Sequence, residues 1–292
     1  MLQIDRMEVD DVGGNPRKLA LAVLKQLRDL APPVPVREIA EALDIYEIRE
    51  EQLTGLEGCL ITTDDKSDGA ILVNSDGSEQ RKRYTIGHEL GHYVNPFHKP
   101  VSAEGFRCSS SDMSVEQFSA GNRALRMEVE ANTFAAELLM PAQLFRSRLD
   151  RIGGLDLGHI LSLADEFCVS REATARRCVA MADEPIAVVF SNRGVIRYVK
   201  RHPSFPRLNV WSGDRLPVVS LSALSSLQIG ELSEWDVVAS DVWLDDREHQ
   251  LICEQTLAQR NGFRMTLLSL ENPSVDDDEQ EYDQWASPTF RR

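Results

Sequence analysis

The residues with the clearest chemical potential are two histidines and a glutamate in the stretch His88-Glu89-Leu90-Gly91-His92. Residues four apart on an α-helix lie on one face, so His88 and His92 can bind one metal ion together. Glu89 lies beside them, where its carboxylate can take a proton from metal-bound water. This is the H-E-x-x-H pattern of zinc hydrolases. The spacing predicts a catalytic zinc site, although two imidazoles and one carboxylate also suit manganese or iron.

A catalytic zinc site needs a third protein ligand and an open position for water. The next acidic helix offers Glu128 and Glu130, which point about 200° apart at 100° per residue. The face of Glu128 is small and apolar, as a buried face should be; it continues through Ala131, Asn132, Ala135, Leu138 and Leu139. We therefore predict Glu128 as the ligand and Asn132 as a supporting group one turn on. Glu130 is interpreted as a solvated charge, with the reverse assignment left open.

Two glycines lie inside the helix that carries the histidines. Gly87 and Gly91 each cost about 1 kcal/mol relative to alanine in a helix interior. Such a cost indicates that another element approaches the helix closely at these positions.

A hydrogen-bond donor to the developing oxyanion usually assists peptide hydrolysis. Tyr84 and His98 are the candidates, and the sequence does not choose between them. Tyr84 lies one turn before His88 on the same face, a place that also suits plain packing. His98 lies in a predicted loop, where most histidines are simply solvated.

The elements that must position these residues follow from apolar spacing and from start and stop signals. Ser78 as N-cap and Pro96 as terminator predict a helix over 79–94. Two extended runs around a turn-rich linker predict a β-hairpin, whose second strand is our candidate edge for an extended peptide substrate. Further helices are expected at 16–30, 36–43 and 124–140, the hairpin strands at 58–63 and 69–74, and a long loop at 97–122.

The rest of the chain carries no comparable motif. Residues 143–182 predict several short helices, of which 157–181 resemble a helix-turn-helix with Arg171, Arg176 and Arg177 exposed. Residues 183–270 favour short strands and helices, and their tryptophans are expected in a core: Trp211, Trp235 and Trp243. Residues 271–283 hold seven acids and no base, which is typical of a disordered tail.

Composition excludes several classes of protein. The 292 residues include 47 acids and 32 bases, for a net charge of −15, which argues against DNA as the main partner. We therefore favour a structural or repressor-docking role for the helix-turn-helix-like segment over direct DNA binding. Five scattered cysteines, an odd number, argue against a disulfide framework and for a cytoplasmic location. No apolar run is long enough to span a membrane.

Two blocks together identify a family resemblance. Residues 83–92 (RYTIGHELGH) and 128–141 (EVEANTFAAELLMP) resemble the ImmA/IrrE metallopeptidases. The similarity covers about residues 15–142 well and continues more loosely to about 205. It implies a zincin-like α+β domain with His88, His92 and Glu128 as zinc ligands and Glu89 as general base. It also implies an endopeptidase that cleaves a helix-turn-helix transcriptional repressor and so switches on a stress or mobile-element response.

The expected organisation has four parts. Residues 1–142 form a zincin-like metallopeptidase domain with a small antiparallel sheet, and 143–182 the helix-turn-helix-like segment. Residues 183–270 form a mixed α/β domain of unknown role. In one branch of the family the corresponding domain is of a sensory type. Residues 271–292 form the acidic tail. The alternative interpretation is a DNA- or protein-binding transcriptional regulator with a non-catalytic metal site. Glu89 favours the enzyme, since a structural zinc site has no use for a general base.

Overall fold

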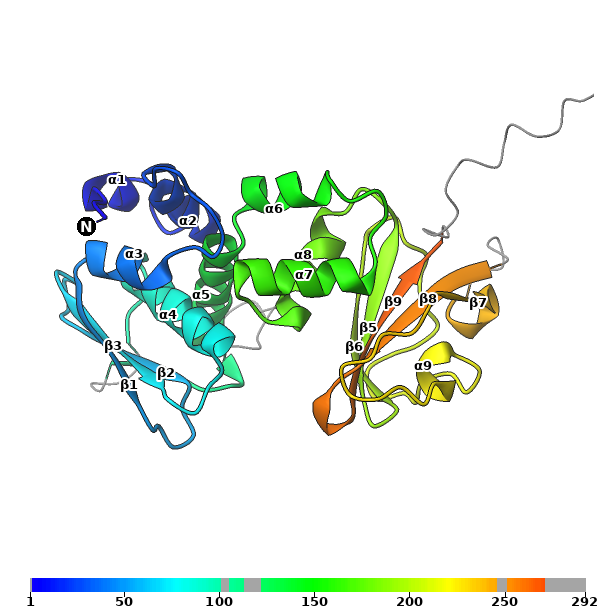
Figure 1. Cartoon of the computed structure of the whole chain (residues 1–292). Helices are drawn as coiled ribbons and strands as arrows, with labels where there is room; N and C mark the ends of the chain where they lie inside the picture. Colours follow the sequence, from blue (N-terminus) through cyan, green and yellow to red (C-terminus); the bar gives the residue numbers. More distant parts are fainter. Residues whose placement is uncertain (1, 101–104, 113–121, 246–250, 271–292) are drawn as a thin grey trace, which may run out of the picture. The chain divides into compact units, whose positions relative to one another are not determined.

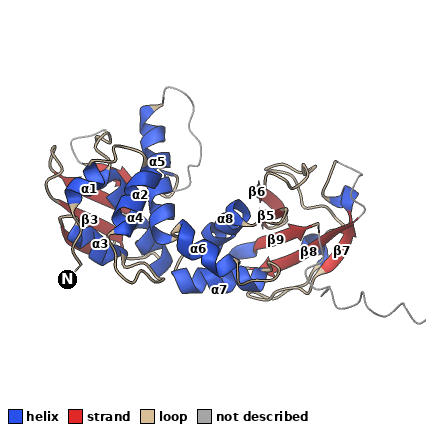
Figure 2. Ribbon diagram, turned by 90° about the horizontal axis from the view of Figure 1, so that it is seen from above, coloured by secondary structure: helices blue, strands red, loops and turns tan. Residues whose placement is uncertain are grey.

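A computed structural model describes residues 2–100, 105–112, 122–245 and 251–270 (Figures 1 and 2). The chain divides into an N-terminal unit, residues 1–149 with 161–177, and a C-terminal unit, residues 150–160 with 178–292. Helices and two sheets confirm the predicted α+β class. The predicted acidic tail, 271–292, lies outside the described residues. Across the described ranges, no helix combines the length and apolar character that a membrane crossing requires.

The sheet of the N-terminal unit has the strand order β1-β3-β2-β4. Its strands are β1 (Ile45–Glu51), β2 (Gly58–Thr62), β3 (Gly69–Asn74) and β4 (Phe106–Cys108). Antiparallel pairing of Cys59 with Leu72 confirms the predicted hairpin of β2 and β3. The sheet is mixed, not purely antiparallel, because β1 pairs parallel with β3. β4 pairs antiparallel with β2 inside the segment expected to be a loop.

The position of β3 contradicts its predicted role as a substrate-binding edge. β3 has β1 on one side and β2 on the other, so its backbone groups are already paired. The outer strands among those described are β1 and β4. The sequence does not predict β1, because most of its residues are charged: Tyr-Glu-Ile-Arg-Glu-Glu. Such a composition suits an outer strand.

Helix α4 lies against this sheet, and α5 packs on α4 (Figures 1 and 2). α4 has the predicted bounds, and the Ser78 side chain accepts a hydrogen bond from the Arg81 amide at its start. Ile86 and Leu90 of α4 are fully buried, as are Leu60 and Ile71 of the sheet. The helices of this region are α1 (Arg6–Asp10), α2 (Pro16–Lys25), α3 (Val36–Ala42), α4 (Glu79–Val94), α5 (Arg123–Leu139) and α6 (Ala142–Leu149). α2 ends at Lys25, short of the expected residue 30, where the chain turns through Asp29 at φ 52°.

Two further helices, α7 (Leu157–Phe167) and α8 (Arg171–Met181), follow as the sequence predicts. The Ser170 hydroxyl accepts from the Ala173 amide at the start of α8. Arg177, one of the three arginines expected on the surface, is held by contacts within the protein. Arg177 donates to both carboxylate oxygens of Glu137, at 3.1 and 2.7 Å, and to the Met140 carbonyl, at 2.8 Å. Arg177 therefore binds the end of α5 instead of facing solvent.

The C-terminal unit is built on a five-stranded antiparallel sheet with the order β6-β5-β9-β8-β7. Its strands and short helices are β5 (Ile186–Asn192), β6 (Val195–Arg201), α9 (Leu221–Leu224), β7 (Asp236–Ala239), η2 (Ser240–Val242), β8 (Leu251–Ala258), η3 (Arg260–Gly262) and β9 (Phe263–Ser269). Trp243 is fully buried in its core, as predicted, but Trp211 is 55% exposed, which corrects the expectation for that residue. None of the five cysteines, all of which lie in the described ranges, forms a disulfide.

Candidate metal site

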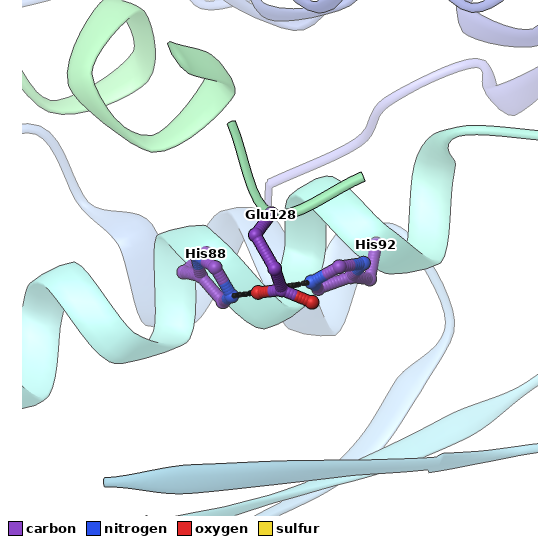
Figure 3. A group of neighbouring side chains, drawn as sticks. All are labelled: His88, His92 and Glu128. Carbon is purple, nitrogen blue, oxygen red and sulfur yellow. Dashed lines mark hydrogen bonds and ion pairs between the residues drawn. The ribbon is translucent and has the colours of Figure 1, made fainter. Parts of the chain in front are cut away.

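Three acceptor groups from two helices converge on one point (Figure 3). His88 and His92 come from α4, and Glu128 of α5 reaches between them. His88 Nε2 lies 3.1 Å from His92 Nε2, and Glu128 Oε2 lies 3.2 Å and 3.5 Å from those two nitrogens. Ligands about 2.0–2.1 Å from a tetrahedral zinc ion would be roughly 3.3 Å apart. The group therefore has the composition and the spacing needed to hold a metal ion.

The two glycines of α4 explain how Glu128 gets so close. A Cβ at Gly91 would lie 3.1 Å from Ala131 Cα, and one at Gly87 would lie 3.4 Å from Ala135 Cβ. Both alanines are fully buried on α5. The predicted close approach of a second element is confirmed, and that element is the small apolar face that begins at Glu128.

Asn132 fixes the orientation of His88. Its Nδ2 donates to the Asp112 carbonyl at 2.9 Å, so its Oδ1 is the atom 2.9 Å from His88 Nδ1. A carbonyl oxygen only accepts, so His88 Nδ1 carries the proton and Nε2 keeps its lone pair for a metal ion. The Tyr84 hydroxyl donates to the same Asn132 oxygen at 2.9 Å. Its proton is committed there, which makes Tyr84 part of the support for His88.

His98 and Glu130 contact each other on the other side of the site. His98 is 1% exposed, its Nδ1 lies 3.0 Å from His92 Nδ1, and its Nε2 lies 2.9 Å from Glu130 Oε2. Glu130 Oε1 also accepts from Arg126 Nε at 2.7 Å. The expectation that His98 and Glu130 are merely solvated is therefore wrong. The two helix faces do point apart, but the turn after α4 places His98 between His92 and Glu130.

Glu89 is fully buried next to the three acceptors. Neither of its carboxylate oxygens has a hydrogen-bond partner among the described residues. Burial, with smaller contributions from the nearby charges of Glu128 and Asp112, raises the pKa of Glu89 well above its ordinary value. β2 passes so close that a Cβ on Gly58 would lie 3.1 Å from Glu89 Oε1. A buried carboxyl without a partner is costly unless it binds a proton, water or cation.

Glu128 behaves differently from Glu89. Burial opposes its ionisation, but the two imidazoles outweigh that effect and hold the pKa of Glu128 at about 2. Burial lowers the pKa of His92 to about 3. At neutral pH the site therefore offers one carboxylate and neutral imidazole, the protonation state in which these groups bind a divalent cation.

Sequence reasoning missed Cys108. Its Sγ lies 3.2 Å from His88 Nε2. The possible ligand atoms of Cys108, His88 and Glu89 all lie within 4.8 Å of one another. Burial raises the pKa of the Cys108 thiol. No spacing in the sequence links this cysteine to α4; only its pairing opposite Gly58 of β2 brings it there.

Comparison with known proteins gives a family and a fold. Residues 46–179 match the sequence model of the IrrE N-terminal-like domain, peptidase family M78, which confirms the resemblance seen in the sequence. A solved structure described as a Mycobacterium tuberculosis transcriptional regulator is similar, with a TM-score of 0.55 and 12% identity. The match covers 92% of this chain and 84% of that one. No curated protein sequence matches.

Proposed function

Because residues 46–179 match the model of the IrrE N-terminal-like domain, we propose that the protein is a zinc-dependent endopeptidase that cleaves a regulatory protein. The observation that carries the proposal is the juxtaposition of three converging acceptors with a buried, unpartnered Glu89. A purely structural zinc site is closed by four ligands and needs no such neighbour. His88, His92 and Glu128 would hold the ion.

A bound zinc ion would polarise the scissile carbonyl and acidify the attacking water. Glu89 is the group of this chain that would accept the proton from that water and later donate it to the leaving amine. Its raised pKa favours taking up that proton and holding it for the leaving amine. The burial that raises this pKa also limits the access of bulk solvent to the carboxylate.

β4 is a better edge for substrate than β3. It pairs with β2 on one side and with no other described strand. Cys108 at its end lies 3.2 Å from His88 Nε2, so a peptide paired with β4 would pass the proposed metal site. An extended segment can bind such an edge through backbone hydrogen bonds.

The substrate that we propose is a helix-turn-helix transcriptional repressor. The family resemblance supports this choice, and its cleavage would switch on a stress or mobile-element response. Co-expression of the full chain with a repressor encoded beside it should yield one discrete cleavage product. The Glu89→Gln variant should give no product while it keeps its zinc. An equal amount of product from both proteins would overturn the proposed mechanism.

The second candidate is a transcriptional regulator that binds DNA or protein and has a non-catalytic metal site. The similar solved structure is described as a transcriptional regulator, which favours this candidate. The contacts of Arg177 with Glu137 and Met140 oppose a DNA-binding role for α8, since they occupy a basic group that would face a phosphate. A mobility-shift assay with promoter DNA at two salt concentrations separates the two functions.

A further inference from the structure

We propose that His98 and Glu130 are positioning residues that hold the imidazole of His92 in one tautomer and one orientation, with Nε2 free for the metal. The inference rests on the proposed metal site and assigns two residues to it that do not themselves bind the ion. It depends on a chain of hydrogen bonds that begins at α5 and ends at His92.

The first link is between Glu130 and His98. An ionised carboxylate only accepts hydrogen bonds, so His98 Nε2, 2.9 Å from Glu130 Oε2, must carry a proton. A neutral imidazole holds one proton, and in His98 that proton is the one on Nε2. His98 Nδ1 is then an acceptor.

The second link follows from the first. His92 Nδ1 lies 3.0 Å from His98 Nδ1, and one of the two nitrogens must donate. Because His98 Nδ1 accepts, His92 Nδ1 carries the proton. His92 Nε2 is left with a lone pair, and it is the atom 3.1 Å from His88 Nε2 and 3.5 Å from Glu128 Oε2.

The two histidines are thus held by different groups of the same helix. Asn132 accepts directly from His88 Nδ1, whereas Glu130 acts on His92 through His98. α5 therefore supplies the carboxylate of Glu128 and, further along the same helix, the groups that orient both imidazoles. Partners of this kind typically change metal affinity 10- to 100-fold when they are removed.

The packing around His98 suits a fixed ring. The ring centroids of His92 and His98 are 5.0 Å apart, and the His92 ring also stacks on Phe106 at 4.6 Å. Arg126 is the exposed end of the chain of contacts, with 63% of its side chain accessible. Its ion pair with Glu130 is screened by solvent and contributes little. Arg126 is therefore the matched control.

The first measurement is the zinc affinity of the full chain, by competition with a chromophoric chelator. The second is the tautomer of His92 in the metal-free protein, by long-range ¹H–¹⁵N NMR at pH 7.5. Glu130→Gln and His98→Phe should each weaken zinc binding about 10- to 100-fold, and Arg126→Gln less than about 3-fold. The metal-free wild type should show a proton on His92 Nδ1, and His98→Phe should lose that single state. A purely structural role for His98 would leave this spectroscopic signature unchanged.

Zinc affinity equal to wild type in both variants, with an unchanged His92 tautomer, would overturn the proposal. If His98→Phe fails to fold, Glu130→Gln decides, because it keeps the size of the side chain. If the wild type binds no zinc, the proposed function fails, and the tautomer measurement still supports or overturns the positioning role by itself.

Discussion

Gly91 of α4 and Ala131 of α5 are in backbone contact: a Cβ added at Gly91 would lie 3.1 Å from Ala131 Cα and 3.2 Å from its carbonyl oxygen. Backbone atoms cannot move aside as the end of a side chain can. The separation of the two helices, and with it the distance from Glu128 to the histidines, is therefore set by the missing side chain at residue 91.

Gly91→Ala should push α4 and α5 apart. Overpacking of this kind costs about 1–3 kcal/mol, against which the better helix propensity of alanine restores about 1 kcal/mol. We expect a net loss of unfolding free energy in urea and weaker zinc binding. Gly87→Ala is the control, because its Cβ would meet Ala135 Cβ at an ordinary 3.4 Å. Equal effects of the two substitutions would contradict the packing argument.

Glu89→Gln should reduce kcat/KM for peptide cleavage by at least about 100-fold, since it removes the general base. Zinc content should stay the same, because Glu89 is not among the three proposed ligands. Activity assays and elemental analysis on the same preparation check both statements. A parallel loss of zinc and activity would mean that Glu89 acts as a ligand instead.

Glu128→Ala should remove zinc more completely than Glu130→Ala does. Glu128 Oε2 lies within 3.5 Å of both imidazoles, whereas Glu130 reaches His92 only through His98. Zinc per chain after dialysis at equal free zinc measures the difference. A larger loss of zinc in Glu130→Ala than in Glu128→Ala would make Glu130 the ligand instead.

Lowering the pH should destabilise the metal-free protein from about pH 6.5 downward. Burial holds the pKa of His92 at about 3 and that of His98 at about 4 in the folded chain, against about 6.5 when unfolded. Between these values the unfolded state binds protons that the folded state does not, so folding loses up to about 1.4 kcal/mol per histidine per pH unit. Urea unfolding at pH 7.5, 6.5 and 5.5 with a chelator present measures this slope, and His98→Phe should make it shallower.

Glu254→Ala should destabilise the C-terminal unit by about 3 kcal/mol or more. The buried Glu254 carboxylate accepts from the amides of Leu221 and Ser222 at 3.1 and 2.8 Å and from Trp243 Nε1 at 3.0 Å. Its removal leaves these three donors without that acceptor. Tryptophan fluorescence during denaturant unfolding, to which the buried Trp243 contributes, reports the change. The exposed Glu234→Ala should stay within about 0.5 kcal/mol of wild type.

The sequence predicts the parts of the site that follow from helical periodicity. His88, Glu89 and His92 share one helix with clear boundary signals, and the small face of α5 is evident from Glu128 onward. The turn after α4 and the short strand β4 follow no period, so the positions of His98 and Cys108 depend on tertiary contacts. β1 is not predicted for a related reason. Its backbone hydrogen bonds come from parallel pairing with β3, and its charged side chains do not show the apolar pattern of a strand.

The two imidazoles of α4 are close in the chain, but Glu128 joins them only after the helix that carries it has docked. A cation held by all three therefore binds the assembled helix pair and not its separate parts, and stabilises that assembly increasingly as its concentration exceeds its dissociation constant. Depletion of the ion would weaken the packing of α5 on α4 before either helix unfolds. Resistance of the α4–α5 pair to proteolysis should consequently follow free zinc concentration, which makes the supply of a trace nutrient a determinant of how long this protein survives.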